Sequence, residues 1–358
     1  MSQEQSNYFG NRLKLARKMA GLSLQEVADK LENLITKQSL SKYELGQMKP
    51  TTDVLLELSK SLNIKPDYFL KQNQTELGQI SFRKGSGLSK KDEEAIVEKA
   101  RDYVERVLEL ENLLGIDNSF INPLQNIPVS TYLDVEKAAY ELRKIWELGA
   151  GPISNIVEIL ELRGIKIFLI EDTDDFDGFA VFTTDGVPIV VINTKNKSLE
   201  RIRFTIIHEL AHILLKFSVE AQFNEKVIEV LCHHFSSCFL IPSRYLVKMI
   251  GGARRSYFTL NELITIKESS GMSIAAILHR LKHLEVITPL YYKKWNVYMN
   301  KNYGKLREPG HYQGEETSKY FEQLINRALS EEIISISKAA ALSNCTINDL
   351  RKKIISVN

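Results

Sequence analysis

Two histidines and a glutamate stand at a fixed spacing within residues 203–215, which read R-F-T-I-I-H-E-L-A-H-I-L-L. His208 and His212 are four residues apart, so on a helix they lie about one turn apart on the same face. Two imidazoles placed this way can bind one zinc ion, and Glu209 beside them can take a proton from a bound water. The alternative is a chance match of two core histidines. The apolar flanks and a glutamate further along the chain favour a metal site.

The third ligand of such a site must come from elsewhere in the chain. A catalytic zinc usually has three protein ligands and one open position for water. One extension of the motif adds a glycine and a third histidine after the second histidine, but this chain has Leu215 and Ser218 at those positions. We therefore expect the third ligand on the next helix, where a carboxylate is a common solution. The candidates are Glu220, Glu225 and Glu229.

Other histidines offer an alternative to a carboxylate. His233 follows Glu229 by one helical turn, and either His233 or His234 could complete a three-histidine site. His279 and His283 are also four residues apart, but no glutamate follows His279 and no third ligand is evident. We predict that these last two are structural or exposed.

The composition limits the class of protein. The chain has 358 residues, a formal net charge of +2 and 26% charged residues, which fits a globular chain of two to four domains. Its three cysteines, Cys232, Cys238 and Cys345, include no C-x-x-C pair, which argues against a disulfide scaffold. No signal peptide or membrane-spanning run is recognised. We expect a soluble, cytoplasmic protein with no membrane partner.

The pattern along the chain predicts an α+β protein that is predominantly helical. Residues 1–73 show five short helical segments that form an N-terminal domain, and the second opens with the capping box of Ser23 and Glu26. A polar linker follows at 72–91, within a linker and spacer-helix region at 74–130. Residues 131–250 combine helices with a small β-sheet, whose strands are predicted at 165–170, 178–182 and 188–193. Residues 251–358 form a C-terminal helical region of unknown role.

Two separated motifs resemble one known family. The segment 203–212, followed by Glu229, Phe235 and the Leu240-Ile-Pro242 end of the next helix, is similar to the ImmA/IrrE family of zinc metallopeptidases. The resemblance covers about residues 134–250, and both motifs occur in the family's order with the family's gap. Cys232 and the pair 236–237 replace residues that are commonly alanine in the family.

The resemblance implies a set of roles. By position, His208, His212 and Glu229 are Zn²⁺ ligands, Glu209 is the catalytic base, and His233 orients a ligand histidine. It implies a zinc endopeptidase with metal-assisted hydrolysis of a peptide bond. The expected substrate is a repressor or antitoxin-type protein, cleaved under stress or in the control of mobile elements.

The N-terminal segment resembles a second family. Residues 12–17, 21–28, 40–46 and Pro50 are similar to the helix-turn-helix domain of xenobiotic-response-element (Cro/repressor-like) regulators. In such folds the third helix enters the major groove of double-stranded operator DNA, often as a homodimer. Residues 1–73 hold eleven Lys/Arg against eight Asp/Glu, so the fold carries this inference more than the charge does. The residues that the resemblance places at DNA are Gln25, Lys37, Gln38, Ser39 and Lys42.

Two functions of different kinds follow from these motifs. The first is a DNA-binding transcriptional regulator that carries a zinc-dependent endopeptidase. The second is a repressor or antitoxin without catalysis, whose zinc-binding fold senses a signal or binds a partner. An N-terminal module that binds protein rather than DNA is the alternative for residues 1–73. A housekeeping protease would leave the N-terminal module unexplained.

Overall fold

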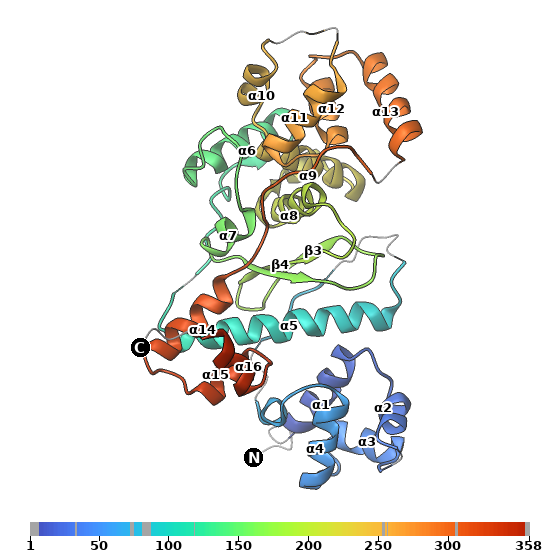
Figure 1. The fold of residues 1–358 in the computed structure, drawn as a ribbon, viewed down its shortest axis with the longest axis vertical. Coiled ribbons are helices and arrows are strands. Elements are labelled where there is room, and N and C mark those ends of the chain that lie inside the picture. The colour runs from blue at the N-terminus through green and yellow to red at the C-terminus, as the bar shows by residue number, and fades with distance from the viewer. Residues whose placement is uncertain are drawn as a thin grey trace. The chain divides into compact units, whose positions relative to one another are not determined.

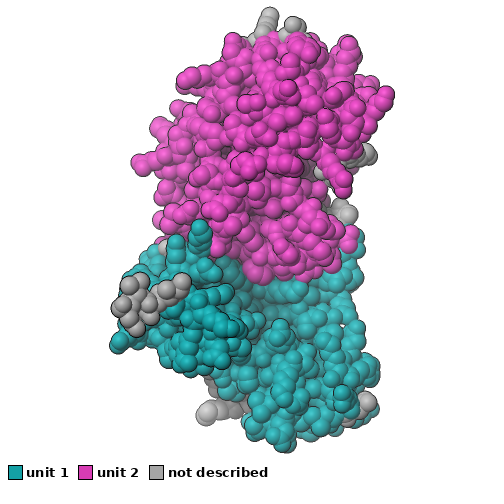
Figure 2. Space-filling model, in the orientation of Figure 1, with its two compact units in different colours: residues 1–118, 182–185, 319–358 teal, residues 119–181, 186–318 magenta. Residues whose placement is uncertain are grey.

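The computed structural model describes residues 7–32, 34–71, 75–80, 87–117, 119–252, 255, 257–304 and 307–354. Within these residues the chain divides into two compact units, which Figure 2 shows in two colours. Unit 1 comprises residues 1–118, 182–185 and 319–358, and unit 2 comprises residues 119–181 and 186–318. The predicted linker at 72–91 falls largely on 72–74 and 81–86, which lie outside the described residues.

Unit 1 is built from helices (Figure 1). Its elements are α1 (Tyr8–Met19), α2 (Leu24–Lys30), α3 (Lys37–Glu44), α4 (Thr52–Ser61), the 3₁₀ helix η2 (Pro66–Leu70), α5 (Lys90–Leu113), α14 (Tyr320–Ser330), α15 (Ile336–Leu342) and α16 (Ile347–Lys353). The five N-terminal segments all form, although the fifth is a 3₁₀ helix rather than an α-helix. They share a core that includes Leu13, Leu40 and Leu58.

Local signals fix most of these helix starts. Ser23 and Glu26 form the predicted capping box at α2, and Thr36 and Thr51 accept backbone N–H groups at the starts of α3 and α4. A second small core joins α5 to the three C-terminal helices. The last three helices of the chain therefore pack within unit 1, although most of that unit is formed by residues 1–118.

Unit 2 combines helices with short strands (Figure 1). Its elements are β1 (Pro128–Val129), α6 (Tyr132–Ile145), α7 (Ile156–Glu161), β2 (Lys166–Ile170), β3 (Gly178–Phe182), β4 (Pro188–Asn193), α8 (Leu199–Leu214), β5 (Lys216–Phe217), the 3₁₀ helix η3 (Val219–Ala221), α9 (Glu225–Leu240), α10 (Ser243–Met249), α11 (Leu260–Ser270), α12 (Ile274–His283) and α13 (Pro289–Tyr303). All three predicted sheet strands are present within a residue of their expected limits.

The sheet of unit 2 explains where α8 lies. The strand order is β2-β4-β3, and β4 pairs in parallel with β2 from Lys166↔Ile189 to Ile170↔Asn193. Every residue of β4 is buried, as expected for the central strand of a covered sheet. Helix α8 packs against β4 on one side and against α9 on the other. The central strand thus supports the helix that carries the two motif histidines.

The predicted fold class, α+β and predominantly helical, is confirmed. None of the helices in the described part of the chain is both long enough and apolar enough to cross a membrane.

Candidate metal centre and candidate nucleic-acid interface

Helix α8 positions His208 and His212 on one face. Its start is fixed by Ser198, whose hydroxyl accepts the backbone N–H of Arg201, and by Glu200 in the first turn. His208 is almost completely buried, with 1% of its side chain exposed, whereas 28% of the His212 side chain is exposed. The motif therefore has one buried end and one end that solvent can reach.

Helix α9 brings a carboxylate to these two rings. Asn224 caps the helix by accepting the backbone N–H of Val227 at 3.0 Å, and α9 packs along α8. Glu229 stands one turn into α9 and lies 3.3 Å from His208 Nε2 and 3.2 Å from His212 Nε2. The structure therefore places Glu229 beside the motif histidines. Glu225 lies at the exposed start of α9, and the side chain of Glu220 lies outside the described residues.

The three side chains fit a tetrahedral zinc ion. His208 Nε2 and His212 Nε2 are 3.1 Å apart, and each nitrogen is 3.2–3.3 Å from a Glu229 oxygen. Bonds of about 2.0–2.1 Å to zinc require neighbouring tetrahedral ligands to be about 3.3 Å apart. Two imidazoles and one carboxylate also suit zinc chemically, and the exposed side of His212 and Glu229 leaves room for water.

The two other histidine candidates, His233 and His234 of α9, have different surroundings. His233 has a ring nitrogen within 4.8 Å of possible ligand atoms of His208 and Glu229. His208, Glu229 and His233 are therefore an alternative set of three ligands. The His233 ring lies 4.3 Å from that of His208 and stacks on Phe204 at 5.7 Å. We favour His212 over His233 as the third member, because its donor atom is within 3.1–3.2 Å of the other two. His234 turns to a different part of unit 2, where its Nε2 lies 3.4 Å from Cys238 Sγ.

One contact at this site was not indicated by the sequence, and the predicted general base, Glu209, is buried. Cys232 Sγ lies 3.7 Å from His212 Nδ1, on the far side of the ring from Glu229, so it packs against the imidazole and restrains it. Glu209 is 4% exposed, so the general-base candidate sits in a largely dehydrated position next to His208. A cysteine at a position that is usually alanine was the only available signal for the Cys232 contact.

A buried ion pair anchors the start of α8. Arg203 forms an ion pair with Glu316, and neither side chain has any exposed surface. Arg203 also donates to the carbonyl oxygens of Ile153 and Ser154. Glu316 accepts the backbone N–H groups at the start of α7. The sequence offered no sign of Glu316, because it lies 113 residues away in a segment without regular structure.

A glycine makes room for that ion pair. Gly271 ends α11 in the left-handed region, with φ of 66°. A Cβ atom at this position would stand 2.5 Å from Arg203 Nε. Glycine is therefore required both for the backbone conformation and for the close approach of the guanidinium.

The predicted DNA-contacting residues lie at the start of α3 and on α2. Lys37, Gln38 and Lys42 are exposed on α3. Ser39 is half-buried, and its hydroxyl lies 3.0 Å from the Thr36 hydroxyl. Gln25 is exposed on α2, where its amide donates to Asp29. Three of the four predicted residues of α3, Lys37, Gln38 and Lys42, thus present long side chains to solvent.

One ion pair ties α3 to α1, and a second ties α1 to α5. Arg17 of α1 donates to both carboxylate oxygens of Glu44, at 2.6 and 2.9 Å, and so ties the end of α3 to α1. Arg12, 2% exposed, pairs with Glu105 of α5 at 2.6 Å and lies over the Tyr68 ring. Leu40 and Tyr43 bury the other face of α3. The helix is therefore fixed on one side and free for a ligand on the other.

Comparison with known proteins agrees with both sequence motifs. Residues 13–69 match the family model described as helix-turn-helix, and residues 161–282 match the one described as an IrrE N-terminal-like domain. The chain therefore carries a helix-turn-helix domain of the xenobiotic-response-element type together with an ImmA/IrrE-like domain, which confirms the two resemblances.

Three curated relatives each match about a fifth of this chain. The HTH-type transcriptional regulator ImmR of Bacillus subtilis (strain 168) is 43% identical over 74 residues, which are 19% of this chain and 57% of ImmR. The SPbeta prophage-derived uncharacterized HTH-type transcriptional regulator YonR of the same organism is 43% identical over 63 residues, 18% of this chain and 56% of YonR. The uncharacterized HTH-type regulator YqaE, again from this organism, is 38% identical over 68 residues, 19% of this chain and 57% of YqaE. The chain thus spans a little over half the length of these relatives.

Proposed function

We propose that this chain is a DNA-binding transcriptional regulator whose unit 2 is a zinc-dependent endopeptidase. The observation that carries the proposal is the convergence of His208, His212 and Glu229, whose donor atoms lie 3.1–3.3 Å apart. We assign the three converging residues as Zn²⁺ ligands. The IrrE N-terminal-like match over the helices that carry them supports this assignment.

The residues around the site have separate tasks in hydrolysis. A zinc ion held there would supply a Lewis acid, which acidifies a water and polarises a peptide carbonyl. The Glu209 carboxylate would accept a proton from such a water and would later donate it to the leaving amine. The burial of Glu209 keeps bulk water from competing for its oxygens. His233, in ring contact with His208, restrains the orientation of that imidazole.

The substrate that we propose is a repressor or antitoxin-type helix-turn-helix protein. The fusion of a helix-turn-helix segment to a peptidase-type domain supports a role in removing repressors. The matched relatives are named as transcriptional regulators, so proteins of this class occur with the same N-terminal fold. Cleavage of such a protein would couple peptide hydrolysis to gene expression.

We propose that unit 1 binds double-stranded operator DNA through α3 as a homodimer. Lys37, Gln38, Ser39 and Lys42 would reach base edges and phosphates, with Gln25 of α2 at the backbone. The proposed domain limits are 1–73 for this module, 74–130 for the linker and spacer helix, 131–250 for the peptidase and 251–358 for the C-terminal region. Such a regulator would act in the cytoplasm, where the DNA is.

The test compares the same substitution, glutamate to glutamine, at Glu209 and at Glu225. The zinc-loaded wild-type chain is incubated with purified helix-turn-helix repressors, and the products are identified by mass spectrometry. Glu209→Gln should lower the cleavage rate at least about 100-fold, the usual contribution of a general base. Glu225→Gln, at the exposed start of α9, is the matched control and should cleave at the wild-type rate. Equal rates for Glu209→Gln and wild type would refute the mechanism.

A second assay separates the peptidase from the rival function. Operator-bound chain is released from DNA by a signal or a partner, and the protein is then checked for cuts. Release that leaves every chain intact, in wild type and in Glu209→Gln alike, would identify a sensing role without catalysis. Release that requires Glu209 would support the peptidase.

A further inference from the structure

Six of the seven histidines of this chain form two groups in unit 2. The rings of His212, His208 and His233 follow one another at 4.8 and 4.3 Å between centroids. A second group, His279, His283 and His234, is linked by ring distances of 4.6 and 5.2 Å. The proposed peptidase site uses only the first group. The second group needs its own explanation.

Three different side chains meet at the end of this second group. His234 Nε2 lies 3.4 Å from Cys238 Sγ, and Cys238 Sγ lies 3.9 Å from Glu136 Oε2. His234 and Cys238 are four residues apart on α9, so they share one helix face, and Glu136 faces them from α6. The ligand atoms of all three lie within 4.8 Å of one another. Bonds of about 2.3 Å to sulfur and 2.0–2.1 Å to nitrogen or oxygen put tetrahedral neighbours about 3.6 Å apart. The observed distances bracket that value.

We propose that Glu136, His234 and Cys238 form a second metal site, separate from the peptidase centre and suited to a zinc-class divalent cation. A thiolate with an imidazole and a carboxylate selects zinc-class ions over magnesium or calcium, which prefer oxygen alone. His283 is the fourth donor candidate, because its ring is 5.2 Å from that of His234. A site with four protein ligands is the structural kind, and here it would join α6, α9 and α12.

The state of the imidazoles and of the carboxylate suits a cation. Burial, and next the Arg280 charge, lower the pKa of His234 to about 4, so its ring is neutral at pH 7. The Nδ1 atom of His234 is buried, and the described residues offer it no hydrogen-bond partner. Burial opposes ionisation of Glu136, but hydrogen bonds from Arg280 outweigh it and lower the pKa of that carboxyl. Two donors are therefore ready before any ion arrives.

The thiol must lose its proton when the ion binds. Burial raises the pKa of Cys238 to about 12, so the free protein holds a thiol there. Binding then follows Cys238–SH + M²⁺ → Cys238–S–M⁺ + H⁺, and the proton passes to solvent. Arg280 Nη1 lies 3.0 Å from Cys238 Sγ and donates to it, and Arg280 also holds Glu136 at 2.6 Å. The guanidinium thus arranges two of the three donors and stabilises the thiolate that forms.

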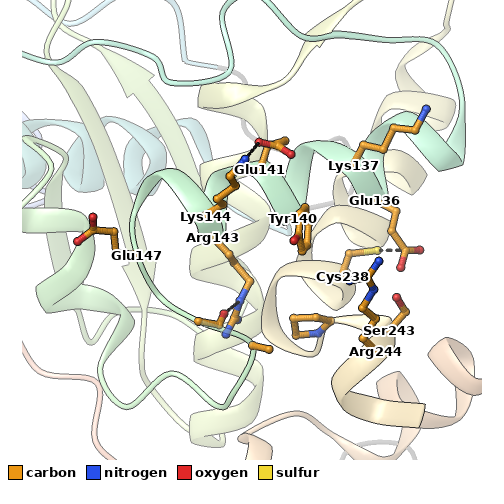
Figure 3. A pocket seen from close by; sticks show the side chains of 13 residues that line it. Glu136, Lys137, Tyr140, Glu141, Arg143, Lys144, Glu147, Cys238, Ser243 and Arg244 are labelled. Atoms are coloured by element: carbon orange, nitrogen blue, oxygen red, sulfur yellow. Dashed lines mark hydrogen bonds and ion pairs between the residues drawn. The ribbon is translucent and has the colours of Figure 1, made fainter. Parts of the chain in front are cut away.

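A cavity gives this cluster a route to solvent. It has a volume of about 550 Å³, and its lining includes Glu136, Cys238, Ser243 and Arg244. Figure 3 shows Glu136 of α6 and Cys238 of α9 facing each other at its wall. An ion can therefore reach the sulfur and the carboxylate without passing through the peptidase centre. The proposal does not depend on whether the chain cleaves peptides.

Cobalt provides a probe that reports only a sulfur-containing site. Full-length protein is stripped of metal, kept reduced and titrated with Co²⁺, while sulfur-to-cobalt charge-transfer absorption is followed in the near ultraviolet. Wild type and His212→Ala should both develop the band, because His212 belongs to the other site. Cys238→Ser should lose it. Cys232→Ser and Cys345→Ser are the matched cysteine controls and should keep it. Added Zn²⁺ should abolish the band by displacing cobalt.

A second variant, His234→Gln, distinguishes loss of the site from loss of folding. His234→Gln keeps the thiol and should weaken Co²⁺ binding at least tenfold, while tryptophan fluorescence shows that unit 2 remains folded. No charge-transfer band in wild type, or a band that survives Cys238→Ser, would overturn the proposal. The peptidase assignment is unaffected by either result, because its ligands include no sulfur.

Discussion

Helices α3 and α8 carry the two sets of proposed functional residues, and their surroundings differ. Both begin at a hydroxyl cap, provided by Thr36 and Ser198. Helix α3 buries two of its eight residues, Leu40 and Tyr43, whereas α8 buries twelve of its sixteen. The side chains that α3 offers to a ligand therefore depend mainly on the helix itself. Those of α8 depend on the whole core of unit 2.

Because of this difference, we expect function and stability to be independent on α3 and linked on α8. Exposed positions on α3 can change with little effect on folding, because surface substitutions usually alter stability by less than about 0.5 kcal/mol. The face of α8 that carries His208 and His212 belongs to a helix buried over most of its length, so changes there affect both the proposed function and the stability.

Removing the buried anchor of α8 should have the largest effect. Arg203→Met leaves Glu316 buried without its partner, and breaking a buried pair costs about 3–5 kcal/mol. Urea unfolding followed by tryptophan fluorescence measures this loss. Of the two tryptophans, Trp146 lies in the core of unit 2 and Trp295 packs against that core, so the signal reports that unit.

An exposed ion pair at the start of the same helix provides the control. Arg201 lies 2.8 Å from Asp177, but 46% of its side chain is exposed. Arg201→Met should therefore cost only about 0–1 kcal/mol. Equal urea midpoints for the Arg201 and Arg203 variants would contradict the claim that burial makes the Arg203 pair decisive.

Zinc should stabilise unit 2 by the next largest amount. A ligand at 100 times its dissociation constant stabilises the folded state by about 2.7 kcal/mol. Zinc should thus raise the unfolding midpoint of Cys238→Ser, in which only the His208, His212 and Glu229 site is intact, and a chelator should reverse the change. The double variant Cys238→Ser/Glu229→Gln should respond little. A full zinc response in the double variant would remove Glu229 from the ligand set.

A buried carboxyl in unit 2 should make stability depend on pH. Burial raises the pKa of Glu161 in α7 to about 7 from 4.5, outweighing the hydrogen bond from Ser318. The folded protein then keeps a proton that the unfolded chain releases, so this contribution is complete below pH 4.5 and disappears as the pH rises through 7. The loss should be of the order of 2–3 kcal/mol.

The neutral variant Glu161→Gln isolates this contribution. The free energy of unfolding of wild type should fall between pH 5 and 7.5, and that of Glu161→Gln should not. The contribution of nearby histidines is the same in both proteins and cancels when the two free energies are subtracted. Glu26 in unit 1 gives the opposite sign, because hydrogen bonds from the Ser23 backbone and then from Lys91 lower its pKa to about 2. Parallel pH curves for wild type and Glu161→Gln would show that Glu161 is ionised in the folded state.

The contrast between α3 and α8 also explains what the sequence could predict. Capping residues act within four positions, so the start of α2 was predicted from Ser23 and Glu26, and Thr36 and Thr51 supply the same kind of local signal at α3 and α4. The strands were predicted because apolar runs between turn residues are local as well. The spacing of His208 and His212 set their common face before any tertiary contact was known.

Contacts between distant segments could not be predicted in this way. Glu316 reaches Arg203 across 113 residues, and no periodicity links them. His279 and His283 were expected to be structural or exposed because no third donor was evident. The fold brings His234 of α9 to His283, and Cys238 lies next to His234. Glu229 was predicted as the third ligand, among three carboxylates, by resemblance to a family, because the helix spacing alone left the choice open.

The smallest effect should come from α3, and it should appear in DNA affinity rather than in stability. Gln38→Ala removes an exposed amide at the helix start. Loss of one base contact should weaken binding by about 1–2 kcal/mol, within the usual range for a base contact. The measurement uses an operator selected from random DNA by the wild-type chain, at one fixed salt concentration. Lys60→Ala on α4 is the control, because Lys60 is 72% exposed.

Lys42 tests the other kind of contact on the same helix. If Lys42 meets a phosphate, Lys42→Ala should weaken binding to all sequences alike and reduce the salt slope by about one. Gln38→Ala should leave that slope unchanged and relax the preference at one base pair. Both variants should unfold at the wild-type urea concentration, since neither side chain is in the core. A variant of α3 that lost affinity only by losing stability would show that α3 depends on its surroundings as strongly as α8 does.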